Sequence, residues 1–243
     1  MTRPEERESR RAEIVGNVPD WYRPWLHLAI PSVLGSVVAG VALSQVRGLS
    51  ALELLAVPLT LLVSFAFEWR VHKHVLHRKA PLLGLIYRRH ELMHHVIYTD
   101  EDMAMRSPRE LWLILMPAYA IVLVFVMVAP FAAVLALLAG SNVAMLMLAT
   151  SMGFFLTYEW LHMAYHQPPE SFIGRLRAVR VLREQHRRHH DPRLMKRWNF
   201  NVTVPVFDIL LGTFWSPERE LQKEARHRAK PSPTAGPHPS TGR

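Results

Sequence analysis

The chain of 243 residues divides into long uncharged stretches and strongly charged ones. Residues 24–46 and 54–67 contain no Asp, Glu, Lys or Arg, and the run 111–158 continues without a charge for 48 residues. A helix needs about 20 apolar residues to cross the hydrocarbon core of a bilayer. The pattern therefore predicts an all-α integral membrane protein with four transmembrane helices, two of them within the long run.

The first two spans are expected over residues 25–45 and 49–67, with Glu53 at the membrane interface. The third and fourth spans need a turn between them, and Ala-Gly-Ser-Asn at 139–142 is a good turn signal. We expect the hairpin at Gly140–Asn142. The alternative, a soluble protein with buried helices, is disfavoured because a soluble core rarely contains a neutral run of this length.

The basic residues indicate the orientation of the spans. Five Lys or Arg precede the first span, one follows it, eight lie between the second and third, none lies in the hairpin, and fifteen follow residue 162. Because Lys and Arg concentrate on the cytoplasmic side of membrane proteins, both termini and the loop over 70–109 are expected there. The net charge of +9 is then a topology signal. The basic residues do not form an isolated module with interleaved aromatic residues, so we expect no nucleic-acid partner.

Eleven of the fourteen histidines lie in four short blocks on this predicted cytoplasmic side, EWRVHKHVLH, HELMHH, EWLHMAYH and HRRHH. Neutral imidazole suits iron, zinc, copper and nickel, and so many nitrogen ligands exceed what one ion accepts. The sequence predicts a His-rich helical cap with two metal ions and ten ligands: His72, His77, His90, His94, His95, His162, His166, His186, His189 and His190. His74 is expected to face elsewhere, and His27, His227 and His238 stand alone as interface or tail residues.

Helical geometry distributes these ligands between the ions. Side chains three or four residues apart lie on one face of an α-helix, whereas side chains one or five apart diverge. His72 and His77 are therefore expected to point toward different ions, and so are His94 and His95. The histidines expected to share a face are His90 with His94, His162 with His166, and His186 with His189 and His190.

The four blocks, with spacings His-x4-His, His-x3-His-His, His-x3-His and His-x2-His-His, resemble the fatty acid hydroxylase/sterol desaturase superfamily of integral-membrane di-iron oxygenases. The segment WNFNVTVPVFDILLGTFW at 198–215 is similar to the stretch that follows the last histidine block in that family. The resemblance covers about residues 55–216. The chain departs from the family pattern at two places. Asn201 stands where the family usually has glycine. In the second block, three residues separate the first two histidines, His90 and His94, where the family often has two.

The resemblance implies a lipid hydroxylase that uses two iron ions, dioxygen and electrons from a separate ferredoxin- or cytochrome-like protein. The substrate, fatty acyl or sterol-like, would come from the bilayer, and zinc would also be able to occupy such a nitrogen-rich site. A lipid desaturase or carotenoid-type hydroxylase on the same metal centre is an alternative. A metal-binding or metal-transport membrane protein is an alternative of another class.

Ligating histidines commonly donate their second N–H to a carboxylate or carbonyl. Glu68 lies four residues before His72, and Glu159 lies three before His162, so both are candidates for this role, although either could simply mark the membrane boundary. Further candidates are Asp100, Asp191, Asn199 and Asp208. The expected organisation is an N-terminal cytoplasmic segment over 1–20, a membrane hydroxylase domain over 21–216, and a disordered tail over 217–243.

Overall fold

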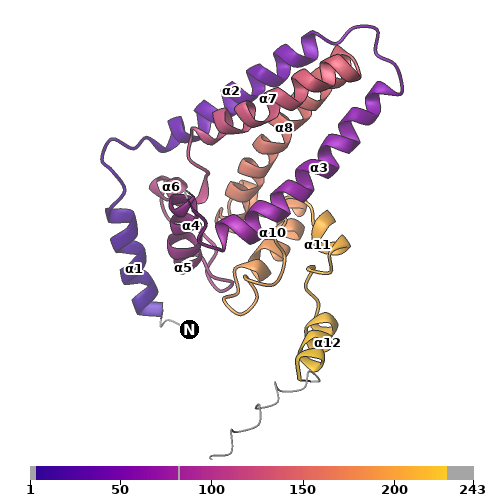
Figure 1. Cartoon of the computed structure of the whole chain (residues 1–243). Helices are drawn as coiled ribbons and strands as arrows, with labels where there is room; N and C mark the ends of the chain where they lie inside the picture. The colour runs from indigo at the N-terminus through magenta and orange to yellow at the C-terminus, as the bar shows by residue number, and fades with distance from the viewer. Residues whose placement is uncertain (1–3, 82, 229–243) are drawn as a thin grey trace, which may run out of the picture.

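The computed structural model describes residues 4–81 and 83–228, and these residues form helices and connecting loops without a strand. Four helical segments are long and apolar enough to cross a membrane. They lie together in the upper part of Figure 1, above a cap of shorter helices. The four segments are α2 (Pro24–Ser44), Glu53–Leu76 with α3 (Ala56–Val71) at its centre, α7 (Ala120–Leu138) and α8 (Ser141–Tyr165). The predicted four-span architecture is confirmed.

Helix α8 is the centre of the membrane bundle, because it packs against α2, α3 and α7. The outward faces of the bundle carry large apolar side chains, such as Phe131, which is 64% exposed, and Leu137, which is 87% exposed. A contiguous apolar surface of this kind is unfavourable in water and matches the hydrocarbon of a bilayer.

The hairpin between α7 and α8 lies at the predicted position. α7 ends at Leu138 and α8 begins at Ser141, and Gly140 between them has φ of 96°, a conformation that glycine adopts without a steric cost. Asn142 bonds to both backbone groups of Arg47, its amide donating to the carbonyl at 2.7 Å. The hairpin and the α2–α3 connection therefore lie at the same end of the bundle.

The third span begins later than the uncharged run does. Residues Leu111–Ile114 form the short helix α6, in which Leu111, Leu113 and Ile114 pack into a buried cluster with Ile97 and Tyr98. The start of the run is therefore the core of the cap rather than a membrane segment. Composition does not separate these two environments, because both exclude charge.

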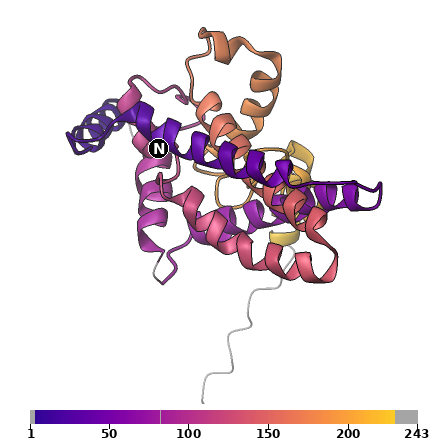
Figure 2. The same ribbon diagram turned by 90° about the horizontal axis from the view of Figure 1, so that it is seen from above.

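The cap gathers at the ends of α3 and α8 from which the histidine blocks extend (Figure 1). Seen from above, α1 and the segment from α9 to α10 project beyond the long helices (Figure 2). The remaining short elements are η1 (Glu53–Leu55), η2 (His72–Leu76), α4 (Gly84–Arg89), η3 (His90–His94), α5 (His95–Ile97), η4 (Pro108–Glu110), α9 (Phe172–Arg175), α10 (Arg177–His189) and α11 (Val206–Leu210).

Both ends of the chain contain more helix than the sequence indicates. The N-terminal segment forms α1 (Pro4–Gly16), which packs against α5. The stretch expected to be a disordered tail begins with α12 (Pro217–Arg228), and residues 229–243 lie outside the described residues. In α12, charge is spread over the whole helix, so it has no apolar stripe of the kind that predicts a helix from sequence.

Candidate metal centre

The ten predicted ligands converge as two adjacent groups of five buried histidines. Within each group, one ring nitrogen of every histidine lies within 4.8 Å of those of the others. The first group consists of His72, His77, His90, His95 and His189, and the second of His94, His162, His166, His186 and His190. The residues come from α3, η3, α8, α10 and their ends, so the four sequence blocks meet in one place.

A π-helical turn brings His72 and His77 into the same group. The turn η2 spans His72–Leu76, and the amide of His77 donates to the carbonyl of His72, five residues back. The two rings stack with centroids 5.0 Å apart. The expected divergence of this pair is therefore wrong, because a π-turn closes its hydrogen bond over five residues rather than four, which brings residues five apart to the same face.

A second π-turn, η3, has the same effect on the HELMHH block. The amide of His95 donates to the carbonyl of His90, and the Nε2 atoms of these two residues lie 3.1 Å apart. His90 therefore joins His95, and His94 joins the second group, although its ring still stacks on that of His90. The expected pairing of His90 with His94 is wrong, whereas the divergence of His94 from His95 is confirmed.

The pairs on regular α-helix follow the ordinary four-residue spacing. His162 and His166, on α8 and at its end, are in one group, and so are His186 and His190, on α10 and at its end. His189 faces the first group instead of joining them. The expectation that all three histidines of HRRHH share a face is wrong. On an α-helix, His189 is rotated by about 60° from His186 in one direction and by about 100° from His190, so it faces away from the direction that His186 and His190 share.

Hydrogen bonds at Nδ1 orient five of the rings. Four Nδ1 atoms donate to backbone carbonyls at 2.5–3.0 Å, and one donates to a carboxylate. The pairs are His72 with Phe200, His189 with Trp198, His166 with Met103, His190 with Tyr98, and His77 with the Glu91 carboxylate. A ring that donates from Nδ1 and is neutral presents the lone pair of Nε2 to the interior of its group.

The inward nitrogens approach each other closely. His77 Nε2 lies 3.0 Å from His189 Nε2 in the first group, and His94 Nε2 lies 3.2 Å from His190 Nε2 in the second. Lone pairs that face each other at this distance repel unless a cation lies between them. The donor set is entirely imidazole nitrogen, which suits iron and other divalent transition metals, and the residues present therefore fit one metal ion in each group.

The electrostatic setting favours the neutral, ligating form of the rings. Burial lowers the pKa of His94, His95 and His189 well below the usual value for histidine, and repulsion from neighbouring histidines lowers it further. At neutral pH these rings are therefore unprotonated, and no proton has to be displaced before a metal ion binds.

Glu91 is a buried carboxylate of the site that the sequence interpretation missed. One of its oxygens accepts from His77 Nδ1 at 2.5 Å, and the other lies 3.0 Å from Lys196 Nζ. The available signal was its place inside HELMHH, directly after His90. Glu91 therefore has the role that helical spacing predicts for Glu68 and Glu159.

The carboxylates expected behind the ligands hold loops instead. Glu68 accepts hydrogen bonds from Asn201, Val202 and Thr203, and Glu159 accepts one from the amide of Met116. Asp208 accepts from the amides of Phe200 and Asn201 and from Thr213 Oγ1, and the side chain of Asn199 accepts from the amide of Trp215. Asp100 is partly exposed, and Asp191 pairs with Arg193. Among the described hydrogen bonds, none of these side chains reaches a histidine of either group.

The effect of these carboxylates is nevertheless transmitted to the metal site. Glu68 and Asp208 fix the loop from Trp198 to Thr213, and this loop supplies the carbonyls that orient His72 and His189.

Within this loop, Asn199 has a positive φ of 56°, and it is the one non-glycine residue with a positive φ in the described part of the chain. Asn tolerates the left-handed conformation better than most residues.

Two of the histidines outside the groups have described surroundings. His27 is buried, bonded to the Tyr22 hydroxyl at 2.7 Å and to the carbonyl of Met116 at 2.8 Å, so it joins α2 to the α6–α7 connection. His74 is partly buried, with its ring against that of Trp69. Both lie apart from the groups, as expected, while the side chains of His227 and His238 lie outside the description.

A small cavity adjoins both groups. It has a volume of about 20 Å³ and is lined by His90 from the first group and His162 from the second. The rest of its wall is mostly apolar and includes Leu113, Ile114 and Tyr158. The arrangement offers a mostly apolar space next to both groups of histidines.

Comparisons with known proteins bear on the family and on the fold. A family model described as fatty acid hydroxylase matches residues 57–213. Among solved structures, the chain is similar to full-length Scs7p, of which only the hydroxylase domain is visible, with a TM-score of 0.52 and 20% identity over 80% of this chain and 67% of that chain. At this identity the likeness concerns the fold. A search of curated proteins finds no match.

Proposed function

The chain belongs to the fatty acid hydroxylase family, and we propose that it is an integral-membrane di-iron oxygenase that hydroxylates a C–H bond of a fatty acyl or sterol-like lipid. The observation that carries the proposal is the pair of buried five-histidine groups with their nitrogens directed inward. Two adjacent sites of this composition suit an oxidation that needs more than one electron.

The residues that would hold the ions are the five histidines of each group. Iron, when bound, supplies the electron transfer to dioxygen that no amino-acid side chain provides. The protein holds the rings in place through their Nδ1 donors, keeps them neutral by burial, and shields them from solvent. These are contributions of position and environment, which a cofactor cannot make for itself.

The cavity beside His90 and His162 is the place where we expect the reacting part of the lipid to bind. Its apolar wall suits a hydrocarbon segment. Because the volume of about 20 Å³ corresponds to a water-sized group, a lipid chain would have to displace lining side chains such as Leu113 or Met116. The lipid would come from the bilayer, which the apolar faces of the bundle contact.

The electrons would come from a separate ferredoxin- or cytochrome-like protein on the cytoplasmic side. Support for this side comes from the distribution of Lys and Arg along the chain. A basic surface around the cap would also attract an acidic donor protein.

The proposal is tested first on products. Lipids extracted from cells with and without the chain should differ by a species that has gained one oxygen atom, and labelled dioxygen should supply that atom. A product that has lost two hydrogens instead would identify a desaturase on the same centre.

The metal requirement is tested with purified protein in a lipid mixture. Protein loaded with Fe²⁺ should turn over with dioxygen and an electron donor, whereas protein loaded with Zn²⁺ should not, since zinc has no accessible redox change. Turnover with zinc alone, or without dioxygen, would contradict the oxygenase function and favour a metal-dependent hydrolase.

A further inference from the structure

The two histidine groups are oriented by two different loops. The carbonyls that hold His72 and His189 belong to the loop after α10, whereas those that hold His190 and His166 belong to Tyr98 and Met103. The segment from residue 98 to residue 107 contains no helix and connects α5 to η4. It also meets the end of α8, where the amide of Met105 donates to the carbonyl of His166 at 2.7 Å. The position of this segment, named here the 98–107 loop, therefore sets the orientation of two ligands of the second group.

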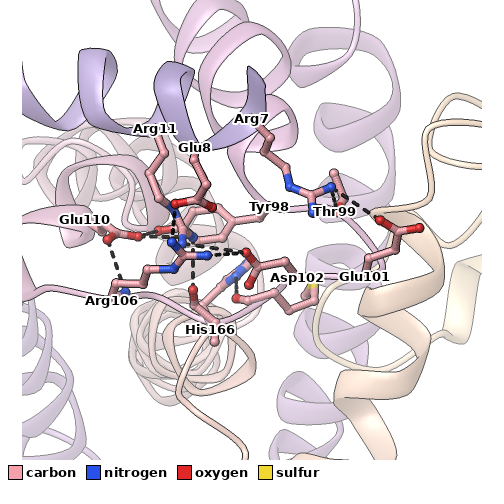
Figure 3. Close-up of polar contacts among 12 residues, drawn as sticks. Arg7, Glu8, Arg11, Tyr98, Thr99, Glu101, Asp102, Arg106, Glu110 and His166 are labelled. Atoms are coloured by element: carbon pink, nitrogen blue, oxygen red, sulfur yellow. Dashed lines mark hydrogen bonds and ion pairs between the residues drawn. The ribbon is translucent and has the colours of Figure 1, made fainter. Parts of the chain in front are cut away.

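Arg11 of α1 is the buried contact that holds this loop. Only 5% of Arg11 is exposed, and its guanidinium donates to the carbonyl of Ala104 at 3.0 Å. It lies 3.4 Å from the carboxylate of Glu110 and stacks over the ring of Tyr98 at 5.2 Å. Figure 3 shows Arg11 reaching from α1 into the space between Glu110 and Tyr98.

Glu110, in η4 directly after the loop, completes the contact. It is 2% exposed, accepts from the Tyr98 hydroxyl at 2.6 Å, and accepts from the amide of Arg106 at 3.1 Å. A buried carboxylate needs a paired cation, and Arg11 is that cation. One arginine thus links Tyr98 and Ala104 of the loop to Glu110 of η4.

A second set of contacts also joins α1 to the loop. Arg7 donates to Thr99 and Glu101, while Arg106 pairs with Glu8 of α1 and with Asp102 (Figure 3). The pair of Arg106 with Glu8 is exposed, and such pairs contribute little stability individually. Arg11 is the most buried of the three arginines, and it contacts both the backbone of the loop and the ring of Tyr98.

We infer that α1, through Arg11 as a positioning residue, orients the second histidine group and so sets the metal affinity of that group alone. Helix α1 lies outside residues 57–213, the part that the family model accounts for. The carbonyls of Tyr98 and Met103 transmit the effect, since a change in their position turns the rings of His190 and His166. This inference rests on the proposed metal-binding function.

The test measures metal affinity on the full-length protein in detergent. Zn²⁺ is the probe because it binds imidazole sites and needs no reductant. Competition against a chromophoric chelator should resolve two bound ions per chain. His190→Ala is the reference variant and should weaken one of them; if it weakens neither, the proposed metal centre itself is wrong.

Arg11→Met should weaken the same ion as His190→Ala, by about 10- to 100-fold, the usual effect of losing a group that supports a metal ligand. The other ion should keep its affinity. Glu8→Gln, which removes only an exposed ion pair on the same helix, should change neither. A general structural role would weaken both ions together and would lower the melting temperature without separating them.

Arg11→Lys covers the case in which Arg11→Met does not fold. Lysine keeps the charge beside Glu110 but lacks the planar fork that reaches Ala104 at the same time. The ion of the second histidine group should therefore again bind more weakly. If His190→Ala weakens one ion while the folded Arg11 variants leave both unchanged, or weaken both equally, the positioning role of α1 is overturned and the metal centre remains.

Discussion

At the scale of single residues, Glu91 is a hydrogen-bond partner of a candidate metal ligand that the local sequence does not indicate. Its carboxylate joins a ligating histidine, His77, to Lys196, a residue that is 62% exposed at its side chain. Nearby carboxylates at helical spacing, Glu68 and Glu159, bind loops instead. Spacing along one helix indicates which residues share a face, whereas the partner of Nδ1 lies on another element.

Glu91→Gln should weaken the binding of one metal ion by about 10- to 100-fold, because His77 loses the charged acceptor that orients its ring. The measurement is a Zn²⁺ titration against a chelator. Lys196→Ala is the control and should have a much smaller effect, since its partner remains hydrogen-bonded to His77 and the lysine is solvated. Equal effects of the two changes would show that the ion pair between Glu91 and Lys196 supports the site, and not the bond from Glu91 to the His77 ring.

His189→Ala should reduce the bound metal from two ions per chain to one, since it removes a ligand from the first group only. The matched control is His74→Ala, which changes a histidine of the same chain that lies in neither group. Elemental analysis of the purified variants gives the metal content. Two ions in His189→Ala, or a large loss in His74→Ala, would contradict the assignment of ligands.

At the scale of elements, the two π-turns decide which histidines act together. In η2 and η3 the residue five positions after the first histidine returns to its face, so His72 with His77 and His90 with His95 act as pairs. Single π-turns are frequent at functional sites. An α-helical interpretation of the same residues assigns the right ligands to the wrong partners.

The loop after α10 orients His72 and His189 of the first group, and the Asp208 carboxylate holds this loop together. Its carboxylate accepts from the amides of Phe200 and Asn201 and from Thr213 Oγ1, at 2.7–2.9 Å. Asp208→Ala should lower the free energy of unfolding by about 3 kcal/mol or more, because buried donors lose a charged acceptor. Thermal or denaturant unfolding measures the change.

Asp20→Ala serves as the control for Asp208→Ala, because Asp20 is exposed. Such surface substitutions usually change stability by no more than about 0.5 kcal/mol. A similar loss in both variants would mean that the loop after α10 does not depend on the Asp208 carboxylate.

At the scale of the whole molecule, the α2–α3 connection and the α7–α8 hairpin meet at one end of the bundle through the contact of Arg47 with Asn142. The histidine groups lie toward the other end. Reporter fusions after Gln45 and after Gly140 should therefore report the same side of the membrane. A fusion after Arg109 should report the opposite side, which the basic residues predict to be cytoplasmic. Agreement of the Arg109 fusion with the other two would exclude the four-span arrangement.

The sequence by itself determined the membrane architecture and the identity of the candidate ligands. A membrane helix needs about 20 predominantly apolar residues, so four spans and the hairpin at Gly140 can be predicted from composition and turn residues. The histidine blocks indicate a metal site because few other roles require so many imidazoles on one side of a membrane.

Only the tertiary structure decided how these residues are combined. The division into two groups depends on π-turns, which differ from α-turns by one hydrogen-bond register and have no distinct residue pattern. The supports of the rings, the carbonyls of Tyr98, Met103, Trp198 and Phe200, are backbone atoms that every residue possesses. The burial of Arg11 in the cap depends on packing between segments about 90 residues apart, and a local pattern of charges does not reveal such a contact.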